Sequence, residues 1–422
     1  MIRNLKTVSL ATTAGAVLAM ALAGPAQAQK GEPIKIGFGM ALTGFLSANG
    51  KQALLGMKIW EEQTNKAGGL LGRPVKLIYY DDKSSPAEVP GIYAKLLDVD
   101  KVDIVVGGYA TNQNAPALPI VIRKGKMFQS MFSLGLNEKF KYPKYFSMLP
   151  TGPTPKQTFT EGFFQTAAAQ KPKPKTVALA AADAEFSLAA CDGARANAKK
   201  YGFKIVYDKT YPPPPKTTDF APVVRAVQAA NPDLFVACSY PLDSVGIVQA
   251  TTEIGYKPKM FGGAMVGLQA TVFKDKLKGK LNGIVNYETW VPSMQYEGTK
   301  EFFQAYQSRA KAEGVDPLGY YLGGWGHAHI AVIGQAIKAA NSVNDDKLAA
   351  VMRKNTFTTV MGPVKYGKNG EWAQSKMVTV QYHDISDASN LETWRGMSYQ
   401  NVLTPKDLKT GEVIYPYAKA VK

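Results

Sequence analysis

Strand-like and helix-like segments alternate along this chain, and this alternation constrains the fold more than any other feature of the sequence. Short apolar runs occur at residues 34–39, 75–80, 103–107 and 127–131. Between them apolar residues recur at helical spacing, and the first such segment stops at Gly68-Gly69, a helix C-terminal signal. Strands that alternate with helices give a mostly parallel sheet with helices on both faces.

The same alternation restarts after a loop at residues 151–155. We expect strands at 177–181, 204–207, 234–238 and 259–261, and helices near 187–200, 220–230 and 243–254. Two consecutive sets of this kind predict an α/β protein with two similar Rossmann-like lobes, and 422 residues are enough for two domain cores.

The later segments are too few for a third domain. They comprise helices near 299–312, 321–340 and 346–353, with strands near 284–288 and 377–382. We therefore predict that the chain crosses back into lobe 1 and then again into lobe 2. Lobe 1 would comprise residues 29–150 plus about 286–375, and lobe 2 residues 151–285 plus about 376–422 with the C-terminal tail. The crossing points would form a hinge beside a cleft at the carboxyl ends of the strands.

Residues 1–28 have the pattern of a secretory signal peptide. Arg3 and Lys6 precede an apolar run at 8–23, and Ala26-Gln27-Ala28 supplies small residues at the two cleavage positions. A membrane anchor is the alternative, but the run is interrupted by polar residues and is shorter than the roughly 20 residues of a membrane span. Residue 29 is Gln rather than Cys, so we expect no lipid anchor and a soluble periplasmic protein.

The net charge of +17 would become +15 after loss of the two cations of the signal peptide (17 − 2). The lysines are scattered, however, and the densest cluster, at 171–175, alternates with proline. We therefore expect no nucleic-acid partner, although a positive field could attract small anions. Two cysteines and three histidines also argue against a metal site, and we expect no metal or cofactor.

Catalytic motifs are weak or missing. Gly37, Gly39 and Gly44 give the spacing GxGxxxxG rather than the dinucleotide-binding GxGxxG, and neither a G-x-S-x-G elbow nor a P-loop occurs. His327 and His329 would project to different sides of one helix, which favours packing or surface roles. We expect a protein that is not an enzyme, with a secreted enzyme as the alternative.

Cys191 falls on a predicted helix and Cys238 at the end of a predicted strand. An oxidising compartment permits a disulfide between them, but spacing alone does not bring their Cα atoms within about 7 Å. We favour two buried thiols over a bridge.

Candidate ligand-binding residues lie at the carboxyl ends of predicted strands. Thr111 and Asn112 precede a helix beside Gly107-Gly108, so backbone N–H groups and a hydroxyl could stabilise a carboxylate there, although ordinary N-capping would explain the same residues. Aromatic residues occupy neighbouring strand ends, and each alone could equally belong to the core. Together they predict an aromatic-walled cleft formed by Tyr109, Phe132, Phe186, Tyr240, Tyr320 and Tyr321.

Several motifs resemble the leucine/isoleucine/valine-binding family of type I periplasmic binding proteins. They are Lys35-Ile36-Gly37 with Leu42-Thr43-Gly44, the run at 65–74 (NKAGGLLGRP), Tyr80-Asp81-Asp82, Asp219-Phe220 with Asn231-Pro232-Asp233, and Val360-Met361-Gly362-Pro363. The likeness extends from about residue 34 to 382 and is weakest in the last 40 residues. It implies a monomer that captures a small solute and delivers it to an inner-membrane ABC permease.

The resemblance also implies roles for individual residues. Thr111 and Ser133 fall where family members hold the ligand carboxylate, and Met131 where a backbone carbonyl faces the ligand. Other ligand-lining positions match Asn49, Phe186, Tyr240 and Tyr321.

This sequence departs from the family pattern at the ligand's ammonium group. The acidic residue expected near Ala264 is missing, and residues 151–154 contain no acid either. A buried ammonium without an anion costs several kcal/mol. We therefore predict a carboxylate ligand without an α-ammonium, namely an aromatic or arylalkyl acid. Branched-chain amino acids or amides remain the alternative, because Asp183, Glu185 or Asp243 could supply an anion.

Overall fold

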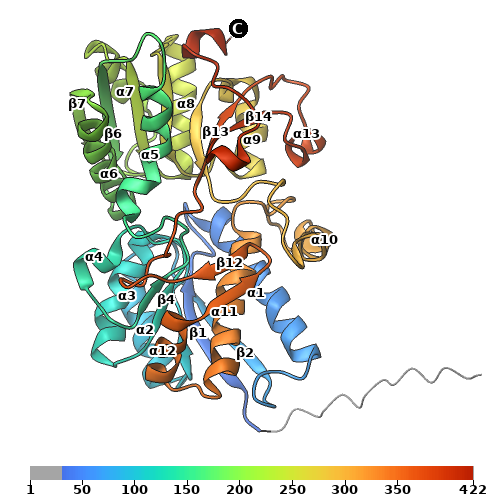
Figure 1. The fold of residues 1–422 in the computed structure, drawn as a ribbon. Coiled ribbons are helices and arrows are strands. Elements are labelled where there is room, and N and C mark those ends of the chain that lie inside the picture. The colour runs from blue at the N-terminus through green and yellow to red at the C-terminus, as the bar shows by residue number, and fades with distance from the viewer. Residues whose placement is uncertain (1–30, 422) are drawn as a thin grey trace, which may run out of the picture.

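Two groups of strands organise residues 31–421, the part of the chain that this computed structural model describes, and each group is the centre of one lobe (Figure 1). The two-lobed α/β architecture expected from the sequence is confirmed. The predicted signal peptide lies outside the described residues. Within residues 31–421, no helix combines the length and the apolar character that a membrane span requires.

Lobe 1 contains two small parallel sheets. In the first, β1 (Ile34–Met40) lies between β2 (Val75–Asp81) and β3 (Ile104–Val105). In the second, β4 (Phe128–Ser130) pairs with β5 (Tyr145–Ser147), and a bridge between Tyr109 and Met131 joins the segments that follow β3 and β4. The helices of the N-terminal half are α1 (Ser47–Lys66), α2 (Val89–Asp98), α3 (Thr111–Arg123) and α4 (Leu136–Phe140).

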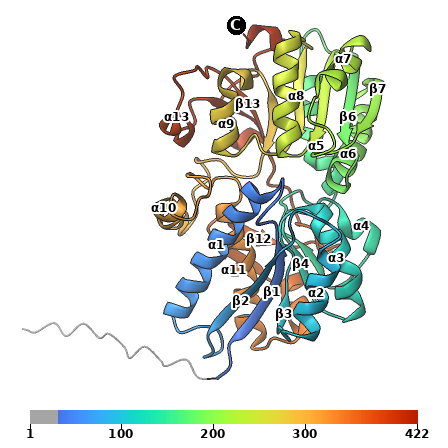
Figure 2. The same ribbon diagram turned by 180° about the vertical axis from the view of Figure 1, so that it is seen from behind.

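Later segments complete lobe 1 (Figure 1). They are α10 (Thr299–Ala310), α11 (Gly323–Ala340), α12 (Asp345–Lys354) and the hairpin of β11 (Thr356–Thr359) and β12 (Gly362–Lys365). Helix α11 packs along α1, as seen from behind in Figure 2. A Cβ atom at Gly56 would lie 2.0 Å from the carbonyl oxygen of Gly323, so this approach depends on glycine.

Lobe 2 has one continuous seven-stranded sheet in the order β14-β13-β10-β9-β8-β6-β7. Its parallel part comprises β6 (Thr176–Ala182), β7 (Lys204–Tyr211), β8 (Leu234–Ser239), β9 (Met260–Met265) and β10 (Val285–Glu288). The strands β13 (Val378–Tyr382) and β14 (Gln400–Thr404) add an antiparallel edge. Strands β8 and β9 are buried along their whole length, as expected when helices cover both faces.

The helices of lobe 2 are α5 (Pro155–Ala168), α6 (Glu185–Tyr201), α7 (Ala221–Ala229), α8 (Pro241–Ile254), α9 (Thr271–Leu277) and α13 (Leu391–Arg395). The chain passes between the lobes three times: between β5 and α5, between β10 and α10, and between β12 and β13 (Figure 1). These passages lie together in the middle of the molecule, which is the arrangement of a hinge.

The structure corrects several predicted elements. The sequence favours a helix from about Ser85, with Pro86 at its first position. Residues 85–88 instead form a hydrogen-bonded turn, and α2 begins at Val89 with Pro90 in its first turn. Helix α3 includes Thr111 and continues to Arg123 instead of starting after Asn112 as a short helix. Helix α5 was not predicted, because its proline-containing N-terminus belonged to the expected loop, and neither β14 nor the β11–β12 hairpin was predicted.

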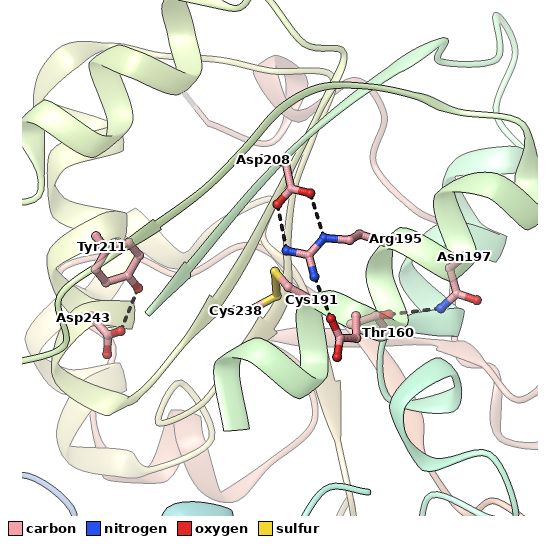
Figure 3. Close-up of a disulfide and its surroundings, with 9 residues drawn as sticks. Thr160, Cys191, Arg195, Asn197, Asp208, Tyr211, Cys238 and Asp243 are labelled. Carbon is pink, nitrogen blue, oxygen red and sulfur yellow. Dashed lines mark hydrogen bonds and ion pairs between the residues drawn. A yellow bond between two sulfur atoms is a disulfide. The ribbon is translucent and has the colours of Figure 1, made fainter. Parts of the chain in front are cut away.

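Cys191 and Cys238 form a disulfide, so our preference for two free thiols was wrong. The bond joins α6 to β8, with the two Cα atoms 6.0 Å apart (Figure 3). Neighbouring polar contacts surround it in lobe 2: Arg195 forms a bidentate ion pair with Asp208 at 2.7 and 2.9 Å, and the Tyr211 hydroxyl donates to Asp243 at 2.7 Å. The parallel sheet places the carboxyl half of β8 under α6, which brings the two cysteines together. The spacing of the cysteines in the sequence contained no information about the distance between them.

Candidate ligand-binding site

A narrow cavity of about 20 Å³ lies between the lobes, and aromatic rings form most of its wall. Six of the sequence-predicted site residues line it: Tyr109, Thr111, Phe132, Phe186, Tyr240 and Tyr321. The other lining residues are Ala110, Leu149, Phe159, Val266 and Tyr287. The aromatic-walled cleft is therefore present, whereas Tyr320 lies elsewhere and packs against Trp290 and Phe303.

Thr111 is the first residue of α3, and the N-cap position is taken by Ala110, whose φ is 86°. No side chain caps this helix start, so Thr111 is not an ordinary N-cap. The Thr111 hydroxyl oxygen accepts a hydrogen bond from the backbone N–H of Leu134 at 3.0 Å. Because a hydroxyl both accepts and donates, its proton can still be donated to a ligand acceptor. The helix N-terminus adds favourable partial positive charge at the same place.

Gly107 and Gly108 are required by packing rather than by ligand access. A Cβ atom at Gly107 would lie 1.9 Å from Oδ1 of Asn114, and one at Gly108 would lie 1.9 Å from the carbonyl oxygen of Gly39. Asn114 organises this loop, since its Nδ2 donates to the carbonyl oxygens of Gly108 and Ala110 at 2.7 and 2.8 Å. Asn114 was not predicted from the sequence, although its position one turn into a helix after a glycine pair was a usable signal.

Hydroxyl groups connect the polar side of the cavity. The Asn49 side chain, which is fully buried, donates to the Tyr109 hydroxyl at 2.9 Å. Asn49 therefore supports the wall from behind. The hydroxyls of Tyr287 and Tyr321 lie 3.0 Å apart, so β10 of lobe 2 contacts the segment before α11 directly.

Burial keeps these phenols protonated. It raises the pKa of Tyr109 to about 12, and it raises the pKa values of Tyr240, Tyr287 and Tyr321 further above the ordinary value. At neutral pH all four are uncharged groups that can donate a hydrogen bond.

Met131 and Ser133 lie next to the cavity without lining it. The Met131 carbonyl oxygen accepts from the N–H of Ala110 at 3.3 Å and from Asn114 at 3.4 Å, so it faces the loop before α3. Ser133 is fully buried, and its carbonyl oxygen accepts from the Ser147 hydroxyl at 3.4 Å.

Phe159 and Tyr287 were missed by the sequence analysis. Phe159 lies on the unpredicted helix α5, and its ring is 4.4 Å from the Tyr287 ring and 5.3 Å from the Phe186 ring, measured between centroids. Tyr287 lies on a predicted strand, near its carboxyl end, where ligand-lining residues are expected. That position was the signal that could have identified it.

Contacts across the cleft show that the lobes are closed. The Tyr240 hydroxyl of lobe 2 donates to Oδ1 of Asn112 in lobe 1 at 3.3 Å, and its ring packs edge-on against Phe45. At the rim, Lys139 lies 3.9 Å from Glu185, and Lys156 lies 3.1 Å from Glu138.

None of the residues that line the cavity, all within the described part of the chain, is charged. The acids that could have replaced the missing anion are engaged elsewhere or exposed. Asp243 accepts from Tyr211, Glu185 is paired with Lys139, and Asp183 faces solvent. Residues 31–421 contain no group of three or more His, Cys, Asp or Glu side chains that could hold a metal ion. His327 and His329 are buried in α11, where each makes a hydrogen bond to a neighbouring element.

The periplasmic binding protein family model matches residues 33–388. The chain belongs to this family. A Leu/Ile/Val-binding protein homologue of Brucella suis is 23% identical over 386 residues, covering 88% of this chain and 93% of the relative. The resemblance to the branched-chain amino acid-binding family is therefore confirmed, and the family's members are periplasmic solute-binding proteins of ABC transporters.

Solved structures of periplasmic binding proteins share the fold. The leucine-binding protein LivK of Thermotoga maritima has a TM-score of 0.73 at 18% identity, covering 89% of this chain and all of that chain. A solute-binding protein of an R. palustris ABC transporter, solved with 4-hydroxybenzoate, has a TM-score of 0.69 at 17% identity and covers 91% of this chain and 97% of that one.

Proposed function

We propose that this periplasmic binding protein closes its lobes on a small carboxylate, an aromatic or arylalkyl acid, and delivers it to an inner-membrane ABC permease. The observation that carries the proposal is the composition of the cavity wall. Rings surround it, neutral hydroxyls supply its polarity, and the N-terminus of α3 lies at its edge.

The carboxylate end of the ligand would lie against lobe 1. There the Thr111 hydroxyl and the first backbone N–H groups of α3 can donate to its oxygens, because an α-helix leaves its first N–H groups without intrahelical partners. The uncharged phenols can add hydrogen bonds without the cost of burying a second charge.

An amino-acid ligand fits this wall less well. Its ammonium would enter a cavity whose lining carries no carboxylate, because neither Asp243, which accepts from Tyr211, nor Glu185, at the rim near Lys139, lines it. An unpaired buried ammonium costs several kcal/mol. The aromatic rings instead offer edge and face contacts to a flat ligand, each worth about 0.5–1.5 kcal/mol beyond area burial.

The relatives support both the receptor function and the two ligand classes that deserve testing. The Brucella relative is named for leucine, isoleucine and valine, and the R. palustris structure holds 4-hydroxybenzoate. We favour the aromatic acid because of the missing anion. A monomeric receptor of this kind performs no chemistry, so a bound ligand should be recovered unchanged.

A thermal-shift screen of purified, ligand-stripped protein tests the proposal. Amino acids, amides and aromatic acids should be compared at equal concentrations, with mass analysis of the recovered ligand. A ligand at about 100 times its Kd adds roughly 2.7 kcal/mol to the free energy of unfolding. Stabilisation by aromatic acids supports the proposal. Stabilisation by branched-chain amino acids alone, or turnover of the bound acid, contradicts it.

A further inference from the structure

A second hollow adjoins the ligand cavity on the far side of two aromatic rings. It is a groove of about 570 Å³ bordered by α5, β13, β14 and the segment that enters β13. Phe159 and Tyr287 line both this groove and the ligand cavity. A single layer of two side chains therefore separates the two spaces.

The ligand cavity itself is too small for an aromatic ring. Its volume of about 20 Å³ is close to the space of one water molecule, whereas a cavity of about 150 Å³ accommodates benzene. Binding of an aromatic acid between closed lobes therefore requires that a wall residue move.

Of the two residues that line both spaces, Phe159 is the one whose side chain makes no hydrogen bond. It has no polar atom in its side chain, and its ring contacts are with Phe186 and Tyr287. Tyr287 is held through its hydroxyl by Tyr321, and Tyr240 is held in the same way by Asn112. Rotation of the Phe159 side chain would break no hydrogen bond, and it would join the cavity to the groove.

We propose that Phe159 is a gate and that the groove is a second subsite, which receives a substituent carried on the ring of the bound acid. This inference rests on the proposed function and sharpens its substrate class to aryl acids with an extended substituent. The carboxylate lies at α3, the ring occupies the opened cavity, and the substituent passes Phe159 into the groove.

The chemistry of the groove suits an apolar chain of several carbon atoms. Met377, Val378 and Leu403 supply apolar surface next to Phe159 and Tyr287. Polar and charged side chains complete the lining: Thr158, Glu161, Gln165, Thr404, Lys406 and Lys409. Burial of each methylene group is favourable, so a butyl chain has enough apolar surface to change affinity measurably.

The test compares benzoate with 4-butylbenzoate by calorimetric titration of the ligand-stripped protein. We expect the wild type to bind 4-butylbenzoate at least tenfold more tightly than benzoate. Met377 is half-buried in the groove and does not line the ligand cavity. Met377→Trp should therefore remove the preference and leave benzoate affinity within threefold of wild type. Met377→Leu, which nearly conserves volume, is the matched control and should keep the preference.

Phe159→Trp tests the gate from the cavity side. A larger ring should obstruct the passage and, like Met377→Trp, reduce the preference for 4-butylbenzoate over benzoate. The gate is overturned if the wild type binds benzoate but binds 4-butylbenzoate tenfold more weakly, or if Met377→Trp weakens both acids equally. Binding of leucine with no response to either acid overturns the proposed function, and the gate with it.

Discussion

The two walls of the cleft differ in what they do with their polar groups. Lobe 1 presents the start of α3 and the Thr111 hydroxyl, both of which can still donate to a ligand. Lobe 2 presents rings, and its two hydroxyls, on Tyr240 and Tyr287, both reach across to lobe 1, to Asn112 and Tyr321. On the proposed function, lobe 1 would recognise the ligand anion, while lobe 2 would cover the ring and use its polar groups to close the cleft.

The two lobes also differ in how they are stabilised. Lobe 2 has the continuous seven-stranded sheet and the Cys191–Cys238 disulfide, whereas lobe 1 is assembled from short sheets and late helices. Neither cysteine lines the cavity. Replacing both with Ala should lower the free energy of unfolding by about 2–5 kcal/mol, the usual cost of losing a native disulfide.

Ligand affinity of this double variant should stay within twofold of wild type. Denaturant unfolding and calorimetry of the same preparations measure both quantities, and reduced wild type is the matched control. A large loss of affinity with unchanged stability would show that the disulfide positions the ligand wall rather than supporting the lobe.

Glu371 lies in the passage between β12 and β13, and its buried carboxyl group should make the stability of the protein depend on pH. It is buried, and neither carboxylate oxygen has a hydrogen-bond partner within residues 31–421. Burial raises its pKa to about 8. Between the ordinary carboxyl pKa and about 8 the folded protein therefore holds a proton that the unfolded chain has released, and stability falls as the pH rises.

Glu371→Gln should flatten this pH dependence by up to about 1.4 kcal/mol per pH unit. Denaturant unfolding of the wild type and the variant at intervals from pH 5 to 8 measures the difference. Asp243→Asn is a useful comparison, because burial raises the pKa of Asp243 to about 7 in lobe 2. Parallel curves for the wild type and Glu371→Gln would show that Glu371 does not carry this proton.

Thr111→Val tests whether lobe 1 recognises the anion. Loss of its hydroxyl should weaken binding of an aromatic acid by about 1–3 kcal/mol, the scale of a hydrogen bond to a charged group. Thr111→Ser retains the hydroxyl and should bind nearly as wild type. Because the Leu134 N–H loses its acceptor in Thr111→Val, unfolding must be measured in parallel with calorimetry. Lower stability with unchanged affinity would show that Thr111 stabilises the loop at Leu134 and does not bind the ligand.

Tyr240→Phe removes one closing contact of lobe 2 while keeping the ring. We expect a loss of binding free energy of about 0.5–1.5 kcal/mol, because the hydrogen bond to Asn112 forms only when the lobes meet. Tyr287→Phe is the matched variant at the other contact. Stopped-flow measurement should locate the loss in the dissociation rate. A lower association rate constant with an unchanged dissociation rate constant would show instead that these hydroxyls act when the ligand first binds.

The sequence predicted the fold best where the local hydrophobic pattern matches the burial of each element in the structure. The buried strands β1, β6 and β8 are apolar runs bounded by turn residues, and their alternation with helices predicted the two lobes. Tyr109, Thr111 and Tyr240 were identified because strand ends meet at the cleft in open α/β sheets.

The remaining features depend on distances between elements. The disulfide required the approach of α6 to β8, which sequence spacing does not encode. Phe159 was missed together with its helix, because Pro155 at the first turn of α5 followed loop residues of the same composition. The glycines at 107 and 108 suggested an exposed backbone, whereas the structure assigns them to close packing against Asn114 and Gly39.

Calorimetric titration of ligand-stripped protein with paired ligands tests the central claim most directly. The pairs differ in the α-ammonium group: leucine with 4-methylpentanoate, and phenylalanine with 3-phenylpropanoate, with benzoate alongside. Because the cavity lining holds no carboxylate, we predict binding of the aromatic acids and no detectable binding of either amino acid. Micromolar binding of leucine or phenylalanine, with no response to the deaminated partners or to benzoate, would contradict the account.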